Sequence, residues 1–196
     1  MADIEGMFHQ VCVPQADSNA LRFLWWKDAN MSSTLHEYQM QVHLFGATWS
    51  PSCAGYALQK TVEDNYQDFD ADVGQTVISI FYVDDCLRSV PTIDEGRRLI
   101  PQLSELLRRG GFRLTKWFSN NKDVMSVIPP SERAESVVDL DLDHLPIEKI
   151  LGMWWDMDVD NFSFKMSTRD VPLTRRGLLC AMRTLYDPLG LSPPMF

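Results

Sequence analysis

The feature that most constrains the fold is an apolar run, Thr76–Val83, that ends on two adjacent carboxylates, Asp84 and Asp85. The run is rich in β-branched and aromatic residues, so we expect a buried strand. Cys86–Val90 is then expected to be the returning strand of a hairpin. Adjacent carboxylates repel each other and are costly to bury, so a hairpin that carries them out of a core predicts a compensating cation.

A divalent cation suits this position, because Mg²⁺ is held by one or two carboxylates together with substrate phosphates. Asp3 supplies a third carboxylate, which would complete a two-metal site with ions roughly 3.5–4 Å apart. Each feature has an ordinary explanation when it is taken alone. An Asp-Asp pair is most often a solvated turn, and an acid near a terminus is most often a mobile surface residue. Only the combination predicts a site.

The other elements follow from hydrophobic periodicity and from turn and capping residues. A helix from Ser50, as its N-cap, to about Asn65 is expected, and Glu63–Gly74 is expected to be an acidic loop. A second helix begins at a Thr92–Glu95 capping box, is kinked at Pro101 and ends at Gly110-Gly111. The expected strands are Leu21–Trp26, Leu35–Leu44 and Phe112–Phe118, the first two joined by a turn at 27–34.

The C-terminal third has a strongly uneven charge. From Ser131 to Asp160 nine acids face two basic residues, a net charge of −7, whereas from Asn161 to the end five basic residues face two acids, a net charge of +3. We expect a loop at Ser126–His144, a hairpin of Lys149–Asp156 and Asn161–Met166, and a basic amphipathic helix at Thr174–Leu185. The whole-chain charge of −9 would by itself argue against nucleic-acid binding. The basic C-terminal segment shows that this total is misleading.

With a strand expected at the N-terminus, the order becomes strand, small hairpin, helix, strand hairpin, helix, strand. This order predicts an α+β fold of the ferredoxin-like β-α-β-β-α-β type, with the helices on one face of the sheet. The architecture supports many functions, so function has to come from the site residues.

Five short stretches together resemble the ordered motifs A to E of reverse transcriptases. They are Asp3–Phe8, Phe45–Pro51, Tyr82–Asp85, Gly111–Lys116 and Leu151–Trp155. The longer stretches Tyr82–Leu87, Gly111–Asn120, Leu151-Gly152 and Tyr186–Gly190 are similar to the Pao/BEL group of LTR retrotransposons. One departure is Phe45, because retroviral relatives carry Gln before the motif B glycine.

The resemblance implies an RNA-directed DNA polymerase, a nucleotidyltransferase in which a primer 3′-hydroxyl attacks the α-phosphate of a deoxynucleotide. Residues 1–125 would form the polymerase palm with motifs A to D, and 126–147 an acidic linker. Residues 148–166 would form the primer-grip hairpin, and 167–196 the start of a basic helical thumb.

The resemblance also implies residue roles. Asp3, Asp84 and Asp85 would form the site of two Mg²⁺ ions, with Mn²⁺ able to substitute; Asp3 and Asp84 would ligate the metals directly, with Asp85 beside them. Lys116 would neutralise or protonate the leaving pyrophosphate. The remaining expected sites are the nucleotide-binding Phe8, Phe45, Gly46 and Tyr82, the primer-grip Gly152, Met153, Trp154 and Trp155, and the nucleic-acid contacts Arg175 and Arg176. Packing in the core would explain Phe8 equally well. For Lys116 the ordinary explanation is a solvated strand lysine without a catalytic role.

The expected partners are an RNA template, a DNA primer and deoxynucleoside triphosphates. Fingers, RNase H and integrase regions of a parent polyprotein are expected outside the chain, and without fingers we expect no primer extension. A non-catalytic or domesticated remnant that binds nucleic acid or a partner protein is the alternative. A different two-metal phosphoryl-transfer enzyme is a third hypothesis, in which motifs B, D and E would be coincidences.

An intracellular, cytoplasmic location is expected, in virus-like particles if the family resemblance holds. No apolar run reaches the roughly 18 residues of a membrane span, and no basic-then-apolar leader is found. The four cysteines are widely spaced without a Cys-x-x-Cys pair, which predicts reduced thiols rather than a disulfide framework or zinc site: Cys12, Cys53, Cys86 and Cys180.

Overall fold

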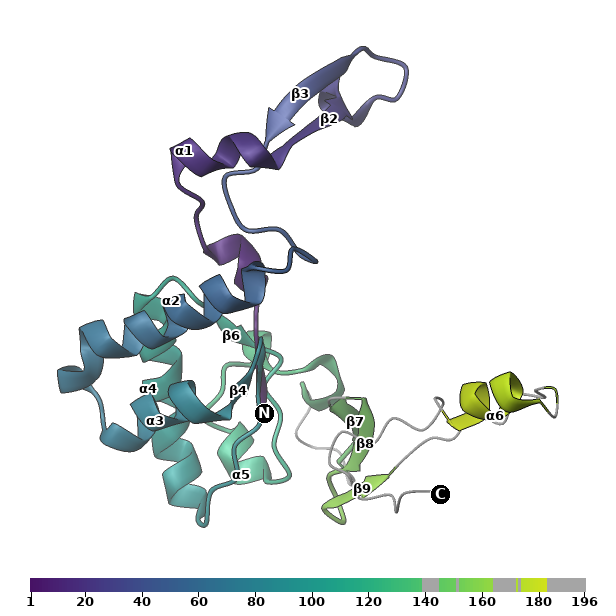
Figure 1. Ribbon diagram of the computed structural model, residues 1–196. Coiled ribbons are helices and arrows are strands. Elements are labelled where there is room, and N and C mark those ends of the chain that lie inside the picture. The colour runs from purple at the N-terminus through teal and green to yellow at the C-terminus, as the bar shows by residue number, and fades with distance from the viewer. Residues whose placement is uncertain (139–144, 151, 164–171, 173, 183–196) are drawn as a thin grey trace. The chain divides into compact units, whose positions relative to one another are not determined.

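The computed structural model describes residues 1–138, 145–150, 152–163, 172 and 174–182 (Figure 1). The chain divides into two units, Met1–Ala134 and Glu135–Phe196, and each is described by itself. Helices and strands are both abundant, so the mixed α+β class predicted from the sequence is confirmed.

The first unit is built on a four-stranded sheet of short strands. They are β1 (Ala2–Ile4), β4 (Phe81–Tyr82), β5 (Asp85–Cys86) and β6 (Leu114–Thr115), in the spatial order β4-β5-β1-β6. Every neighbouring pair is antiparallel. The N-terminal strand therefore lies inside the sheet, between the carboxylate-bearing hairpin and the strand that follows the last long helix.

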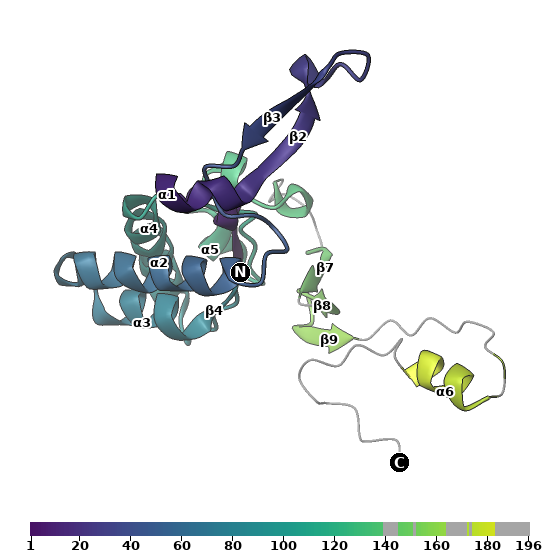
Figure 2. The same cartoon turned by 45° about the horizontal axis from the view of Figure 1, so that its top comes forward.

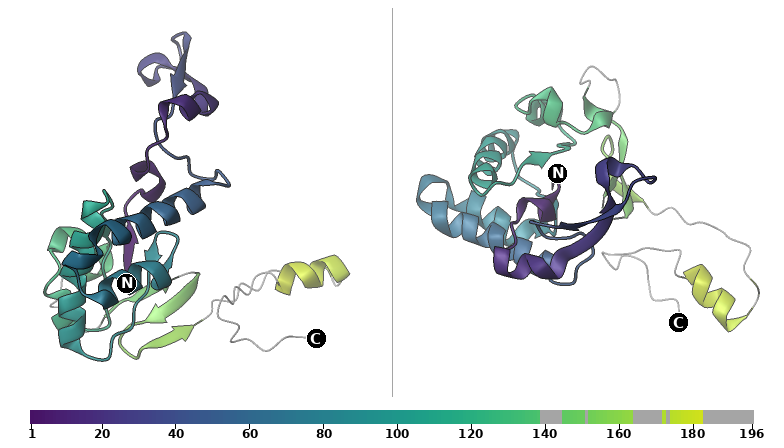
Figure 3. Two further views of the ribbon diagram at one scale, coloured as in Figure 1. Left: turned by 60° about the vertical axis from the view of Figure 1, so that its left-hand side comes forward. Right: turned by 90° about the horizontal axis from the view of Figure 1, so that it is seen from above.

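Three helices, α2 (Ser50–Asn65), α3 (Ala71–Ile80) and α4 (Ile93–Arg109), pack on one another beside this sheet (Figure 3). The short helix α5 (Lys122–Met125) packs on α4. Helix α4 confirms its predicted boundaries, because the Thr92 hydroxyl accepts a hydrogen bond from the Glu95 amide at 3.3 Å and the helix ends before Gly110. Its core face is made by the leucines at the predicted spacing, Leu99, Leu103, Leu106 and Leu107.

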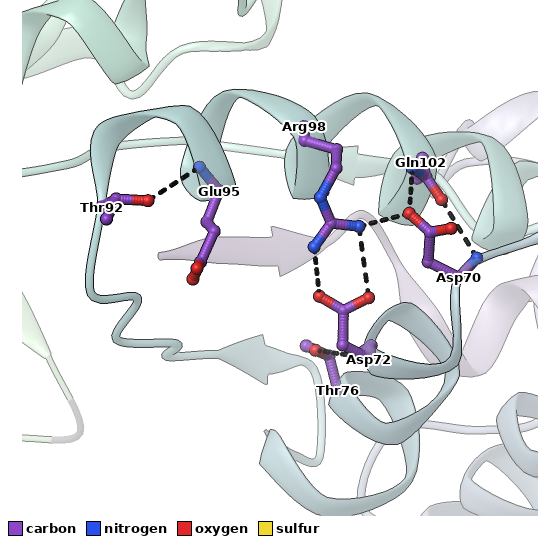
Figure 4. A network of polar contacts seen from close by, with 7 residues as sticks. All are labelled: Asp70, Asp72, Thr76, Thr92, Glu95, Arg98 and Gln102. Carbon is purple, nitrogen blue, oxygen red and sulfur yellow. Dashed lines mark hydrogen bonds and ion pairs between the residues drawn. The ribbon is translucent and has the colours of Figure 1, made fainter.

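Helices α3 and α4 are joined at the surface by a cluster of polar side chains (Figure 4). The Arg98 guanidinium bonds both Asp70 and Asp72, with Nη2 2.6 Å from Asp72 Oδ2. The Gln102 amide donates to Asp70 Oδ2 at 2.8 Å. The bidentate Arg98 contact holds the pKa of Asp72 below its usual range.

The predicted strand Thr76–Val83 is wrong over most of its length. Residues up to Ile80 belong to α3, and only Phe81–Tyr82 is strand. Val73, Thr76 and Val77 are buried at helical spacing, and a short apolar run does not distinguish a buried strand from a buried helix. The expected acidic loop Glu63–Gly74 is shorter than predicted, because α2 reaches Asn65 and α3 already begins at Ala71.

Two other predicted strands are shorter than expected. Strand β6 covers only Leu114–Thr115 of the predicted Phe112–Phe118, and it ends where Lys116 adopts a positive φ of 51°. Strand β5 covers only Asp85–Cys86 instead of reaching Val90. Ser50 is not the N-cap either; it lies inside α2 and its hydroxyl donates to the Leu44 carbonyl at 2.7 Å.

The predicted early hairpin is confirmed as a separate two-stranded sheet of β2 (Arg22–Trp26) and β3 (Leu35–Gln39), which stands apart from the long helices (Figure 2). The second strand ends at Gln39, before the predicted Leu44. Helix α1 (Gln15–Ser18) and the 3₁₀ helices Met7–Gln10 and Asn19–Leu21 precede the hairpin. The 3₁₀ helix Lys27–Ala29 lies in its turn. The short helical turns Tyr66–Asp68 and Pro130–Glu132 complete the unit.

The second unit contains a three-stranded antiparallel sheet, β7 (Ile147–Ile150), β8 (Met153–Asp156) and β9 (Asn161–Ser163), after a 3₁₀ helix at Glu135–Val137. The single strand expected at Lys149–Asp156 is therefore wrong: Gly152, at φ 86°, turns the chain between two strands. Helix α6 (Arg175–Met182) confirms the predicted basic helix over the described residues. The predicted loop at 139–144, the end of the predicted hairpin at 164–166, and residues 183–190 at and beyond the end of the predicted helix lie outside the described residues.

Within the described residues no helix combines the length and the apolar character that crossing a membrane requires.

Candidate active site

Four side chains form one row across the sheet of the first unit. Tyr82 on β4 pairs with Asp85 on β5, Asp85 pairs with Asp3 on β1, and Asp3 pairs with Thr115 on β6. Residues directly opposite each other in an antiparallel sheet project from the same face with close Cβ atoms. We call these four residues the cross-strand row.

The opposite face of the sheet belongs to the hydrophobic core. The neighbours of the row along the strands alternate to that face, and all four have at most 3% of their surface exposed: Ala2, Ile4, Cys86 and Leu114. This alternation requires Asp3 and Asp85 to lie on the face away from the core. The side chain of Asp3 keeps 23% of its surface exposed.

Asp84 lies in the two-residue turn, Val83-Asp84, that joins β4 to β5. Its carbonyl accepts a hydrogen bond from the Ile4 amide at 2.9 Å, which ties the turn to β1. Val83 has a φ of 58°, a conformation that β-branched residues rarely adopt. Strain of this kind is found mostly at functional sites, where the surrounding structure maintains it.

The electrostatics of the row depend on crowded negative charge. Burial raises the pKa of Asp85 above its usual value, and the nearby Asp84 and Asp3 carboxylates raise it further. Lys116 opposes these effects, because its ammonium group lies 3.3 Å from Asp3 Oδ1 and donates a hydrogen bond to it. The site therefore already holds one cation against its carboxylates.

The fit of a metal ion can be tested on the same side chains. Among the described residues, no three His, Cys, Asp or Glu side chains are grouped so that they could hold a metal ion together. The structure does pair Asp3 with Asp85, and the adjacent Asp84 adds its charge. This arrangement fits Mg²⁺ only if water and substrate phosphates complete its coordination, which is how Mg²⁺ is usually bound at phosphoryl-transfer sites.

Of the residues expected to bind the nucleotide, Phe8 and Phe45 are in contact, whereas Tyr82 lies on β4 in the cross-strand row. Phe8, in the 3₁₀ helix Met7–Gln10, contacts Phe45, with ring centroids 5.8 Å apart. Phe45 is 82% exposed and Tyr82 is 66% exposed, so both rings are open to a ligand. Gly46 has a φ of 85° and open space where a Cβ would lie, so the backbone conformation is what favours glycine here.

The expected primer-grip residues occupy the turn and strand of the second unit. Met153 and Trp155 are buried and Trp154 is half-buried, which confirms the predicted alternation of the two tryptophans along the strand. The Trp155 indole donates to Asp160 Oδ1 at 2.9 Å. Arg175 and Arg176 are exposed in the first turn of α6. All of these residues belong to the second unit.

Thr115 is the member of the row that the sequence did not single out. Thr115 immediately precedes Lys116. Alternation along the strand could have shown that Thr115 and its buried neighbour Leu114 point to opposite faces of the sheet. The strand register, which sets Asp3 directly opposite Thr115, is visible only in the folded sheet.

A scan against protein-family models found no match for this chain, and a search of curated proteins found none either. The site geometry and the ordered motifs are therefore what indicate the function of this chain.

Proposed function

We propose that this chain is the palm and adjoining primer-grip region of a reverse transcriptase of the Pao/BEL retrotransposon type. It would bind an RNA template, a DNA primer and deoxynucleoside triphosphates. The observation that carries the proposal is the direct pairing of Asp3 with Asp85, with Asp84 in the adjoining turn. Three carboxylates from two segments about 80 residues apart in the sequence thus reach one edge of the core.

The topology supports a palm-type fold. The chain runs from β1 through α2 and α3 to β4, turns directly into β5, and passes through α4 to β6. The order β4-β5-β1-β6 with antiparallel neighbours supports a ferredoxin-like β-α-β-β-α-β sheet. The same layout accommodates many functions, so the fold supports the proposal only together with the carboxylates.

In this function the residues of the row bind and orient the reacting groups. Mg²⁺, when bound, supplies the charge that stabilises the attacking and leaving oxygens. Asp3 and Asp85, which the strands pair, would hold the ion. Asp84, the direct ligand expected from the resemblance, would add to the negative charge that attracts it. The primer 3′-hydroxyl loses its proton to solvent and its oxygen forms a bond to the α-phosphorus, while the bond between that phosphorus and the pyrophosphate oxygen breaks. Lys116, whose ammonium group donates to Asp3, would neutralise or protonate the leaving pyrophosphate.

Phe8, Phe45 and Tyr82 would contact the incoming nucleotide from the side of the exposed rings. The contact of Phe8 with Phe45 supports a joint role, because it holds two aromatic rings near the N-terminal end of α2. Trp154, Gly152 and Met153 would contact the primer, and Arg175 and Arg176 would contact phosphates.

A non-catalytic remnant that binds nucleic acid or a protein is the second candidate. The observation that favours it is the lack of a ready three-ligand metal group among the described residues. The two candidates differ in whether metal binding depends on Asp3 and Asp85.

Metal binding is therefore the first test. Mn²⁺ binding, followed by electron paramagnetic resonance, should weaken by at least about tenfold in Asp3→Asn and in Asp85→Asn. Asp17→Asn, which removes an exposed carboxylate of α1, is the matched control and should leave binding unchanged. Equal Mn²⁺ affinity in all four proteins would overturn the metal site.

Primer extension on an RNA template is the second test. The chain is assayed with Mg²⁺ or Mn²⁺, both alone and extended at its N-terminus by a fingers segment. The extended protein should incorporate deoxynucleotides, and Asp84→Asn should abolish the incorporation. Metal binding without incorporation by the extended protein would favour the remnant instead.

A further inference from the structure

Thr115 occupies the position on β6 directly opposite Asp3, on the side of β1 away from Asp85. Asp3 therefore has a carboxylate on one side and a hydroxyl on the other. Thr115 is only 9% exposed, so its position is determined by the sheet and by the packing around it.

The hydroxyl of Thr115 is available to a partner on the site face. Among the described residues, no hydrogen bond is made by this hydroxyl. The oxygen of Thr115 is not one of the fully buried polar atoms without a partner, so water can reach it in the free protein. An acceptor on the site face can replace that water. The acceptor opposite it is the Asp3 carboxylate.

The donors beside Asp3 differ in what a metal ion would do to them. The Lys116 ammonium competes with a metal ion for the carboxylate, because both are cations at the same oxygen. Asp85, when ionised, has no proton to donate. Thr115 is a neutral donor, so its hydrogen bond to Asp3 is compatible with a bound cation.

We propose that Thr115 is a positioning residue: its hydroxyl donates a hydrogen bond to the Asp3 carboxylate and orients it toward the metal ion. This inference rests on the proposed function of the row. Carboxylates that bind metals are generally oriented by hydrogen bonds from neighbouring groups, and loss of such a group weakens metal affinity by about 10–100-fold.

The test compares Mn²⁺ affinity in Thr115→Val, which removes the hydroxyl but keeps the shape, with that in Thr115→Ser, which keeps the hydroxyl. Thr115→Val should weaken binding by about tenfold, and Thr115→Ser should stay near the wild type. Thr34→Val, at an exposed position between β2 and β3, is the matched control and should have no effect. Thermal unfolding of each variant verifies that it is folded, and Thr115→Ala replaces Thr115→Val if that variant does not fold.

Unchanged Mn²⁺ affinity in Thr115→Val would overturn the positioning role while leaving the metal site standing. Equal weakening in Thr115→Ser and Thr115→Val would also overturn it, because Thr115→Ser keeps the hydroxyl and its loss of affinity would show that packing at this position, rather than the hydroxyl, sets the Mn²⁺ affinity. If Asp85→Asn binds Mn²⁺ as the wild type does, the failure is that of the metal site, and the role of Thr115 is overturned with it.

Discussion

Asp3 and Asp85 lie directly opposite each other on the antiparallel strands β1 and β5, with Asp84 in the turn beside them. Like charges directly opposite in a sheet are destabilising, and the Lys116–Asp3 contact offsets only part of this repulsion. An arrangement that costs stability in the free protein is typical of sites that bind a cation. The measurable consequences begin with this carboxylate pair.

Asp85→Asn should raise the melting temperature at pH 7. Folding raises the pKa of Asp85, so the folded protein holds this proton more tightly and the ionised carboxylate destabilises it above that pKa. The advantage of the variant should shrink as the pH is lowered toward the ordinary Asp value of about 3.9. Thermal unfolding between pH 4 and pH 7 measures it. Asp94→Asn, in the first turn of α4, should not raise the melting temperature, and an equal gain there would contradict the prediction.

Val83→Gly should stabilise the protein by about 0.5–1 kcal/mol, because glycine adopts a positive φ without the penalty that valine carries. Val159→Gly is the control, since Val159 also lies in an exposed turn but has no positive φ. Urea unfolding compares the two variants. A loss of stability in Val83→Gly would show that contacts of the valine side chain outweigh the strain.

Gly110→Ala should destabilise the protein by about 1–3 kcal/mol through overpacking between α2 and α4. A Cβ at Gly110 would lie 2.1 Å from Thr61 Oγ1 and 2.6 Å from its Cγ2. Thr61→Ala in the same protein should restore part of the loss. Gly55→Ala, in α2 with open space around it, should instead be neutral or stabilising. Additive effects of the two changes at 61 and 110 would refute the proposed contact.

Replacing Arg175 and Arg176 with Gln should weaken primer–template binding and reduce the salt dependence of binding. Each arginine that neutralises a phosphate contributes about 0.9 to the slope of log K against log salt, so the slope should fall by about 2. Fluorescence anisotropy at several salt concentrations measures both quantities. Lys60→Gln, on the exposed face of α2, serves as the control for charge alone. Unchanged affinity and slope would remove α6 from the interface.

Elements with strong local signals could be predicted from the sequence. The boundaries of α4 follow from Thr92, from the leucine spacing and from Gly110, all of which act within a few residues of their own position. Helix α2 and the β2–β3 hairpin were found in the same way. The ordered motifs also drew attention to Asp3, Asp84 and Asp85, although their arrangement stayed an expectation.

Elements whose local signal is ambiguous could not be predicted. Thr76–Ile80 is apolar and β-branched, which favours a strand locally, yet it is helical because Val73, Thr76 and Val77 bury one face beside α2 and α4. Packing overrides propensity in such a segment. Gly152 similarly divides a predicted strand in two, because its positive φ turns the chain.

The sequence by itself determined which side chains can carry charge and where helices can begin and end, because these properties reside in single residues or short patterns. Only the tertiary structure decided that Asp3 faces Asp85 on one side and Thr115 on the other. Strand register depends on contacts between segments far apart in the chain, and a shift of one residue would turn Asp3 toward the core. The cross-strand row is therefore a property of the folded sheet.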